Sequence, residues 1–332
     1  MIGKPKAMTY FSRVASYEAR SERQFGKGLF AAPDDFRLTD SQRGKATVSK
    51  FSIGNLIIGE VRSTGHEVVV REPFGATLLV PLNGRLVSET GNETHCAIGN
   101  SGALLFSPNT RRTKVIAAKD SDFLAVPVIV PFSEIAETAE RMGVSPSKVR
   151  RATSFSLEMR NQPRHVTSEL TNICMSLYSE IARGSCRLDL SDARSNWSRL
   201  IVEKIVEVMD EAEVLSLPCM TRHSTSRQHV NRAMEYMRSN KSDIELIAEV
   251  AGACGVSNRT LEHAFKVELG MTPLQVLTNF RLEDARAMLL DRNCDYGVTD
   301  VALASGFRHL GRFSRIYRNH FGETPSKTRA QR

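Results

Sequence analysis

The sequence predicts an α+β protein with two parts: a β-rich N-terminal part that continues into helices, and an all-helical C-terminal part. Three patterns lead to this prediction. Short β-branched runs separated by turn residues fill residues 51–132, and apolar residues at helical spacing follow as far as residue 215. From about residue 227 a helical pattern occurs twice. A chain of 332 residues is long enough for two domains that each bury a core.

Residues 1–45 mix Lys, Arg, Asp and Ser with a few aromatic residues. We expect a short helix around residues 12–24 and a loosely held remainder. A basic arm of this kind can contact nucleic acid, but a solvated leader is the favoured interpretation.

The β-rich segment contains six candidate strands, at residues 56–61, 66–70, 76–82, 84–87, 103–106 and 123–130. Asn83-Gly84 and Gly91-Asn92 have the composition of hairpin turns. Regular strand spacing of this kind predicts a small barrel or sandwich.

Helices are predicted at residues 132–142, 166–182 and 195–215. The last of these carries Ile201, Ile205, Val208 and Ala212 at alternating steps of four and three. Such a stripe can pack on its own domain or pair with a copy in a second subunit. Periodicity alone leaves both alternatives open.

A motif in the C-terminal part is repeated. Leu261-x3-Phe265-Lys266-x2-Leu269-Gly270-x-Thr272-Pro273 returns 52 positions later as Phe313-x3-Tyr317-Arg318-x2-Phe321-Gly322-x-Thr324-Pro325. Upstream of each copy lies a helix of small and apolar residues that ends at a glycine, Gly255 or Gly306. Glycine suits a sharp reversal in which a side chain would be in the way. Each copy is therefore predicted to be a helix-turn-helix, whose second helix enters the major groove of DNA.

The two copies are joined by a predicted helix at residues 274–289, with Thr272 as its cap and Pro273 at its first position. Its length is about 24 Å at roughly 1.5 Å per residue. Successive major-groove faces of B-DNA lie about 34 Å apart. A stiff spacer of this length can place both recognition helices on one side of the duplex.

The predicted DNA-binding side chains lie on the outward faces of the two recognition helices. Arginine suits guanine or phosphate, asparagine suits adenine, and glutamate accepts from cytosine. The alternative for the first helix is a solvated face on which Glu262 pairs with Lys266. The candidates are Ser257, which also caps the first helix, Asn258, Arg259, Glu262, His263 and Lys266, and then Arg308, His309, Gly311, Arg312, Arg315 and Arg318.

The net charge is +8 and the pI is about 9.3, which favours a polyanionic partner. After Val301 the only acidic residue is Glu323. The arginines around the expected buried Phe307 and Phe313 would repel one another on a free surface, and phosphate would screen them.

Metal, cofactor and catalytic chemistry are not expected. The six cysteines have no C-x-x-C spacing, and His66 and His95 stand alone rather than in a cluster of metal ligands. No apolar run has the length of a signal peptide or a membrane span, so we expect a cytoplasmic protein without membrane contact.

These motifs resemble the DNA-binding domain of the AraC/XylS family of transcription regulators over roughly residues 225–330. Gly306-Phe-Arg-His-Leu-Gly-Arg-Phe313 is most similar to the XylS branch, whose members sense aromatic acids. Gly102-Ala-Leu-Leu-Phe-Ser-Pro108 resembles the cupin-like sensor domain of the family. His309 and Leu310 depart from the acidic or amide residues common in the family, so no operator sequence is carried over.

The resemblance implies an arm (1–45), a cupin-like β-barrel or sandwich that binds an effector and carries a helical dimerisation segment (46–215), a linker (216–226) and a double helix-turn-helix domain (227–332). It implies a homodimeric activator that binds double-stranded promoter DNA, contacts RNA polymerase and responds to a small molecule, with an aromatic acid as one candidate. The stripe on 195–215 would then dimerise. Strand alternation makes His66, Val68, Leu79 and Phe106 the candidate effector contacts.

Two alternatives remain. The N-terminal part could serve assembly alone, without a ligand. An enzyme fused to the DNA-binding domain, such as a repair alkyltransferase, would need an activated cysteine, but Cys219 is followed by Met220 and not by a base.

Overall fold

The computed structural model describes residues 9–18, 21–24, 29, 32–72, 75–91, 93–99, 101–144, 155–214, 225–269, 271–291, 294–321 and 323–330. Contacts divide the chain into two compact units, Met1–Cys219 and Met220–Arg332. The predicted linker 216–226 lies outside the described residues as far as position 224, as do Asn92, Gly270 and Gly322. The domain boundaries drawn at residues 45 and 215 stay predictions.

The N-terminal unit is a sandwich of two antiparallel sheets. The larger has the strand order β13-β10-β7-β12-β5-β4-β1-β2, and the smaller has the order β3-β6-β11-β8-β9. The larger sheet contains β1 (Ser12–Glu18), β2 (Ser21–Gln24), β4 (Lys45–Ile53), β5 (Leu56–Ser63), β7 (Gly75–Asn83), β10 (Leu104–Phe106), β12 (Phe123–Pro131) and β13 (Ser156–Glu158). The smaller contains β3 (Ala32–Leu38), β6 (His66–Glu72), β8 (Arg85–Thr90), β9 (Glu93–Ile98) and β11 (Asn109–Ile116).

All six strands predicted from β-branched runs are confirmed. Strand β6 alternates between buried and half-buried residues, because one of its faces meets the other sheet and the opposite face does not. Strand β7 is buried from Gly75 to Pro81, because it lies between the smaller sheet on one face and helices on the other.

The helix expected around residues 12–24 is wrong. Ser12–Glu18 is strand β1, which pairs with β4 through Ser16↔Thr47 and Tyr17↔Ala46, so this part of the leader belongs to the sandwich. Val14, Ala15 and Tyr17 are buried there. Partners more than twenty residues away along the chain, not local propensity, give this segment its strand conformation.

The hairpin expected at Asn83-Gly84 is also wrong. Strand β7 ends there in the larger sheet and β8 begins in the smaller one, so the chain changes sheets at this corner. Gly84 has a φ of 77°, and a Cβ would lie 2.5 Å from the carbonyl oxygen of Ile116. The second predicted hairpin is confirmed, since Thr90 of β8 pairs with Glu93 of β9.

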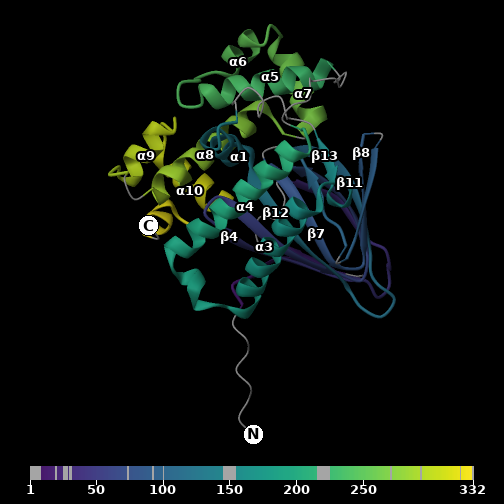
Figure 1. Cartoon of the computed structure of the whole chain (residues 1–332). Helices are drawn as coiled ribbons and strands as arrows, with labels where there is room; N and C mark the ends of the chain where they lie inside the picture. The colour runs from purple at the N-terminus through teal and green to yellow at the C-terminus, as the bar shows by residue number, and fades with distance from the viewer. Residues whose placement is uncertain are drawn as a thin grey trace. The chain divides into compact units, whose positions relative to one another are not determined.

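The predicted helices of this unit are confirmed as α1 (Phe132–Arg141), α3 (Arg164–Arg183) and α4 (Ser191–Glu211), with short 3-10 turns η1 (Met159–Asn161) and η2 (Cys186–Asp189). Figure 1 shows α3 and α4 beside the larger sheet, where they share one apolar core with β5, β7 and β12. The sandwich therefore has a second core, distinct from the one between its sheets.

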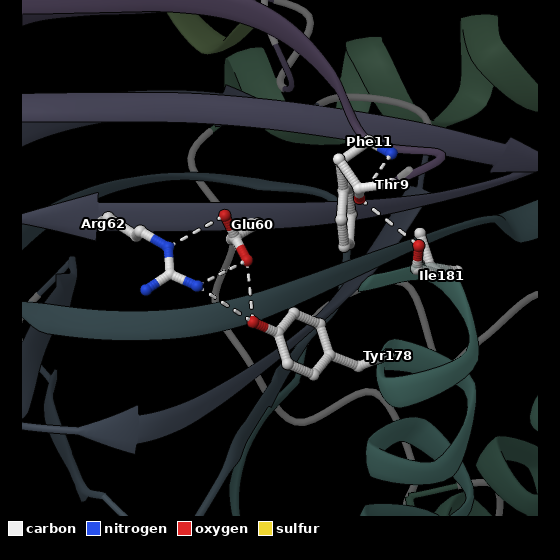
Figure 2. A network of polar contacts seen from close by, with 6 residues as sticks. All are labelled: Thr9, Phe11, Glu60, Arg62, Tyr178 and Ile181. Carbon is white, nitrogen blue, oxygen red and sulfur yellow. Dashed lines mark hydrogen bonds and ion pairs between the residues drawn. The ribbon is translucent and has the colours of Figure 1, made fainter. Parts of the chain in front are cut away.

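A polar network fastens α3 to the larger sheet (Figure 2). The Tyr178 hydroxyl donates to Glu60 Oε2 at 2.7 Å, and the Arg62 guanidinium donates to both oxygens of Glu60 at 3.0 Å. Burial raises the pKa of the Tyr178 phenol to about 12, and the Glu60 carboxylate adds to that rise. Near the end of the same helix, the Thr9 hydroxyl donates to the carbonyl of Ile181 at 3.3 Å.

The C-terminal unit is all-helical, as predicted. Its joining helix begins where the sequence indicated: the Thr272 hydroxyl accepts from the backbone N–H of Gln275, and Gln275 Oε1 accepts from the N–H of Thr272 at 2.7 Å. No helix in the described ranges has the length and apolarity to cross a membrane. The helices are α5 (Thr225–Ser239), α6 (Ile247–Ala253), α7 (Asn258–Leu269), α8 (Pro273–Leu290), α9 (Val298–Ala304), α10 (Leu310–Phe321) and α11 (Pro325–Arg329).

Candidate nucleic-acid interface

The first helix-turn-helix consists of α6, a turn at Gly255 and α7. Gly255 has a φ of 69°, a left-handed conformation that glycine adopts without strain, yet a Cβ there would meet no atom within 4 Å. The turn therefore requires glycine for its backbone, and not for lack of space as the sequence suggested. Ser257 caps α7, because its hydroxyl accepts from the N–H of Thr260 at 3.1 Å.

Helix α7 buries one face and exposes the other, as predicted. Leu261, Ala264 and Phe265 are buried. Among the described residues, Glu262 and Lys266 do not form the ion pair that the alternative of a solvated face required. Both charges therefore remain available to another partner. The exposed side chains include all the predicted contacts: Ser257, Asn258, Arg259, Glu262, His263 and Lys266.

The second helix-turn-helix consists of α9, a turn at Gly306 and α10. An aromatic series fixes α10 on the unit: Phe307 is half-buried, Phe313 and Tyr317 are buried, and successive rings lie 4.9 and 5.5 Å apart. The Tyr317 hydroxyl donates to Thr328 Oγ1 at 3.0 Å, which ties α10 to α11. The outward face of α10 carries the predicted contacts Gly311, Arg312, Arg315 and Arg318, and His309 directly precedes the helix; all five residues are exposed.

The positive charge of α10 is left largely uncompensated. Among the described residues, Arg312, Arg315 and Arg318 have no carboxylate partner. The nearby acid, Glu323, instead accepts from the Thr328 hydroxyl at 2.9 Å and lies 3.7 Å from Arg286 of α8. Three guanidinium groups on one exposed helix form a surface to which phosphate groups are attracted.

Arg308 departs from this pattern. It was expected to have no acidic neighbour, but its guanidinium pairs with Glu245, which lies between α5 and α6. The sequence missed this pair because the two residues are 63 positions apart. A contact of Arg308 with DNA must therefore compete with Glu245.

The predicted effector contacts lie in two places between the sheets. Leu79 and Phe106 belong to the apolar cluster of the sandwich interior. His66, the first residue of β6, is buried at the second place, where its ring stacks on that of Phe36 with 4.8 Å between the ring centres. Burial lowers the pKa of His66 to about 4. Val68, also buried, follows on the same face of β6.

Arg111 of β11 is a candidate that the sequence prediction missed. Its side chain is 1% exposed, its guanidinium carbon lies 5.1 Å from the centre of the Phe106 ring, and its Nη1 donates to Asn109 Oδ1 at 2.9 Å. Burial lowers the pKa of Arg111 to about 10, against the opposing effect of the Glu72 carboxylate. Strand alternation did not reveal it, because Arg111 faces inward with Thr113 and Val115 while an identical residue type, Arg112, faces outward with Lys114.

The interior sites do not coincide with a pocket at the sheet-changing corner. An open pocket of about 380 Å³ lies there, lined in part by Leu82, Arg85, Ile98 and Ala117. None of the four predicted effector contacts lines it. Among the described histidine, cysteine, aspartate and glutamate residues, no group of three or more is placed to hold a metal ion.

The candidate dimerisation residues lie mostly inside the unit. Ile201, Ile205 and Val208 of α4 are at most 1% exposed and belong to the core that α4 shares with α1, α3 and the larger sheet. Ala212 is half-buried. As they lie here, the first three side chains cannot also pack on a second copy, which favours the intramolecular alternative.

Comparison with known proteins agrees with the C-terminal architecture. Residues 250–331 match a family model described as a helix-turn-helix domain. The chain is 32% identical over 139 residues to a XylDLEGF operon transcriptional activator of Pseudomonas putida, a match that covers 42% of this chain and 42% of that protein. It is 30% identical over 139 residues to XylDLEGF operon transcriptional activator 2 of the same species, covering 40% of this chain and 82% of that relative.

A solved structure, a probable AraC family transcriptional regulator from Rhodopseudomonas palustris CGA009, is 34% identical with a TM-score of 0.31, and the match covers 31% of this chain and 96% of that one. The matches to the first of the curated relatives thus span about two fifths of their length. The relative that is covered over most of its length decides the family. The chain belongs to the AraC family of transcription regulators, which is not a family of enzymes.

Proposed function

We propose that this protein is a sequence-specific double-stranded DNA-binding transcription regulator in which α7 and α10 enter successive major grooves. The observation that carries the proposal is the exposed face of α10, where Arg312, Arg315 and Arg318 have no acidic partner among the described residues. Unscreened guanidinium groups at this density favour a polyanion, and a helix of a helix-turn-helix is the element that fits a major groove.

The joining helix supports the reading of two grooves by one chain. Helix α8 has 18 residues, which correspond to about 27 Å at roughly 1.5 Å per residue. It begins with a capping box and contains no interior glycine or proline, so nothing in its sequence introduces a kink. Each end leads into one helix-turn-helix.

A salt-dependent binding titration tests this proposal. A duplex is selected with the full chain from a random library, and its affinity is measured by fluorescence anisotropy at several salt concentrations. We expect Arg312→Ala to weaken binding by about 10-fold or more, because one good arginine contact is worth roughly 1–3 kcal/mol. Lys327→Ala removes a charge from α11 of the same unit and should change affinity by no more than about 2-fold. Specific binding by Arg312→Ala at wild-type strength would refute the contact.

The N-terminal unit is proposed to bind a small molecule between its two sheets. Supporting this are the buried guanidinium of Arg111 beside the Phe106 ring, and the Ser88–Thr113 hydroxyl pair at 2.9 Å in the same interior. An acid with an apolar or aromatic body fits this combination of groups. The competing proposal, assembly without a ligand, has the closely packed apolar cluster of that interior in its favour.

A thermal-shift comparison distinguishes the two proposals. Benzoate is tested against neutral benzamide on the full chain and on Arg111→Met. Stabilisation by benzoate alone, lost in the variant, supports an acid-binding interior. No shift with a broad panel of metabolites supports the assembly proposal.

Activation, RNA polymerase contact and homodimerisation complete the proposal. The relatives reported above are named as operon activators, which favours activation here. Dimerisation through α4 would have to use its exposed side, where Leu200 lies, because Ile201 and Ile205 are in the core. Analytical ultracentrifugation with and without DNA tests this, and a monomer under both conditions contradicts it.

A further inference from the structure

The segment between α5 and α6, residues 240–246, is held by the joining helix. Arg281 of α8 donates from Nε to the carbonyl of Lys241 and from Nη2 to the carbonyl of Ile244, both at 2.6 Å. One turn further along α8, Asp284 lies 2.6 Å from the ammonium of Lys241. Two short hydrogen bonds from one planar guanidinium fix both the position and the direction of the segment.

The second helix-turn-helix meets the same segment. The turn at Gly306 packs so closely that a Cβ there would lie 2.9 Å from the carbonyl oxygen of Ser242 and 2.8 Å from Arg281 Nε. Two residues later, Arg308 pairs with Glu245. The segment therefore contacts α8 and the second helix-turn-helix at once.

The charges at this meeting point make the geometry specific. Arg281 and Arg308 are both cationic, and burial, followed by the repulsion of Arg308, lowers the pKa of Arg281. Two backbone carbonyls and the Glu245 carboxylate offset that repulsion. A lysine at position 281 would keep the charge but lacks the rigid, planar fork that places Nε on the Lys241 carbonyl and Nη2 on the Ile244 carbonyl.

We propose that residues 240–246 form the joint that locks the two helix-turn-helix units into one rigid body, and that Arg281 is its positioning residue. The joint sets the orientation of α7 relative to α10, and with it the separation of the two DNA segments that one chain can contact together. The DNA consequence rests on the proposed function, whereas the rigidity of the joint does not.

A distance measurement tests the joint without DNA. Spin labels are placed at Val267→Cys on α7 and Asn319→Cys on α10, both exposed positions, in a full chain whose Cys96, Cys186, Cys219 and Cys294 are replaced by serine. Double electron–electron resonance should give a narrow distribution of the distance between the two labels in the protein that keeps Arg281. In Arg281→Met the distribution should be at least about twice as broad. Equal widths in folded protein overturn the proposal.

Two further variants separate positioning from stability. Arg232→Met makes the same chemical change on α5, where Arg232 Nη1 donates to the carbonyl of Cys254 within the first helix-turn-helix, and it should leave the distribution narrow. Arg281→Lys should broaden the distribution despite its retained charge, and it replaces Arg281→Met as the deciding variant if the latter does not fold. A width for Arg281→Lys equal to that of the wild type then overturns the proposal.

A helical-phase experiment tests the DNA consequence. Selected duplexes that contain both half-sites are compared with versions carrying 5 additional base pairs between them. For the wild type, linkage of the half-sites should contribute about 100-fold in affinity, and 5 additional base pairs should remove it. For Arg281→Met the linkage should fall to about 10-fold or less, with single-half-site affinity unchanged. If the wild type selects no sequence, the proposed function fails, while the distance distributions still decide the joint.

Discussion

Replacing the turn glycines of the two helix-turn-helix units by alanine distinguishes backbone strain from lack of space. Gly255 and Gly306 occupy equivalent turns and have similar φ values of 69° and 80°. They differ in their surroundings. A Cβ at 255 would meet nothing within 4 Å, whereas at 306 it would lie 2.9 Å from the Ser242 carbonyl oxygen and 2.8 Å from Arg281 Nε.

The expected cost differs accordingly. A left-handed alanine costs roughly 1–2 kcal/mol, partly offset by about 0.4–1 kcal/mol because alanine restricts the unfolded chain. Gly255→Ala should therefore lower the free energy of unfolding by about 1 kcal/mol. Gly306→Ala adds a close contact with backbone and with a hydrogen-bonded guanidinium, for which overpacking costs of roughly 1–3 kcal/mol are typical. Its total should be about 2–4 kcal/mol.

Urea titration of the full chain measures this difference. Circular dichroism at 222 nm follows the helices, and the fluorescence of Trp197, the single tryptophan, follows the N-terminal unit through α4. With a slope of about 1.5 kcal/mol/M, a difference of about 2 kcal/mol moves the midpoint of the C-terminal unit by roughly 1.3 M. The Trp197 transition should not move. Equal midpoints for the two variants would refute the crowding argument at Gly306.

Three further perturbations have defined outcomes. Glu245→Gln should free Arg308 and so strengthen non-specific DNA binding several-fold with a steeper salt dependence. Asp243→Asn removes the same charge nearby and serves as the control. An equal effect of the two variants would mean that net charge, and not the release of Arg308, is responsible. Thr272→Ala should destabilise the C-terminal unit by about 1 kcal/mol through loss of the α8 cap, and an unchanged urea midpoint contradicts this. Burial lowers the pKa of His66 to about 4. Below about pH 6.5 the unfolded chain binds a proton at His66 that the folded protein does not bind, so the free energy of unfolding falls as the pH falls from 6.5 toward 4. At pH 5 this loss is about 2 kcal/mol. The Trp197 urea midpoint should fall less between pH 7 and pH 5 in His66→Phe than in the wild type, and identical falls would contradict the assignment.

The C-terminal unit was predictable because its signals are local. The repeat, the glycines before each recognition helix and the Thr-Pro helix starts all act within a few residues, so the sequence located α7, α8 and α10 and their outward faces. What it could not provide were contacts between distant segments. In the sequence, Arg281 and Glu245 resemble ordinary surface charges. In the fold, Arg281 donates to the backbone of residues 240–246, and Glu245 pairs with Arg308.

The N-terminal unit was predictable only where strands are apolar. Strands β5, β7 and β12 consist mostly of apolar residues, whereas β11 has the sequence NTRRTKVI, whose polar and charged residues resemble a loop. Its inward Arg111 breaks the apolar-in, polar-out rule on which strand prediction depends. Strands β1 to β3 were missed for a related reason, since their pairing partners, and not their composition, give them their structure.

The most direct test of the central claim is a hydroxyl-radical footprint of the full chain on a selected duplex. Two groove-reading helices joined by α8 predict two protected segments about one helical turn apart on the same face of the duplex. Arg259→Ala should weaken protection of one segment and Arg312→Ala that of the other. A single protected segment, or two segments on opposite faces, would contradict the account.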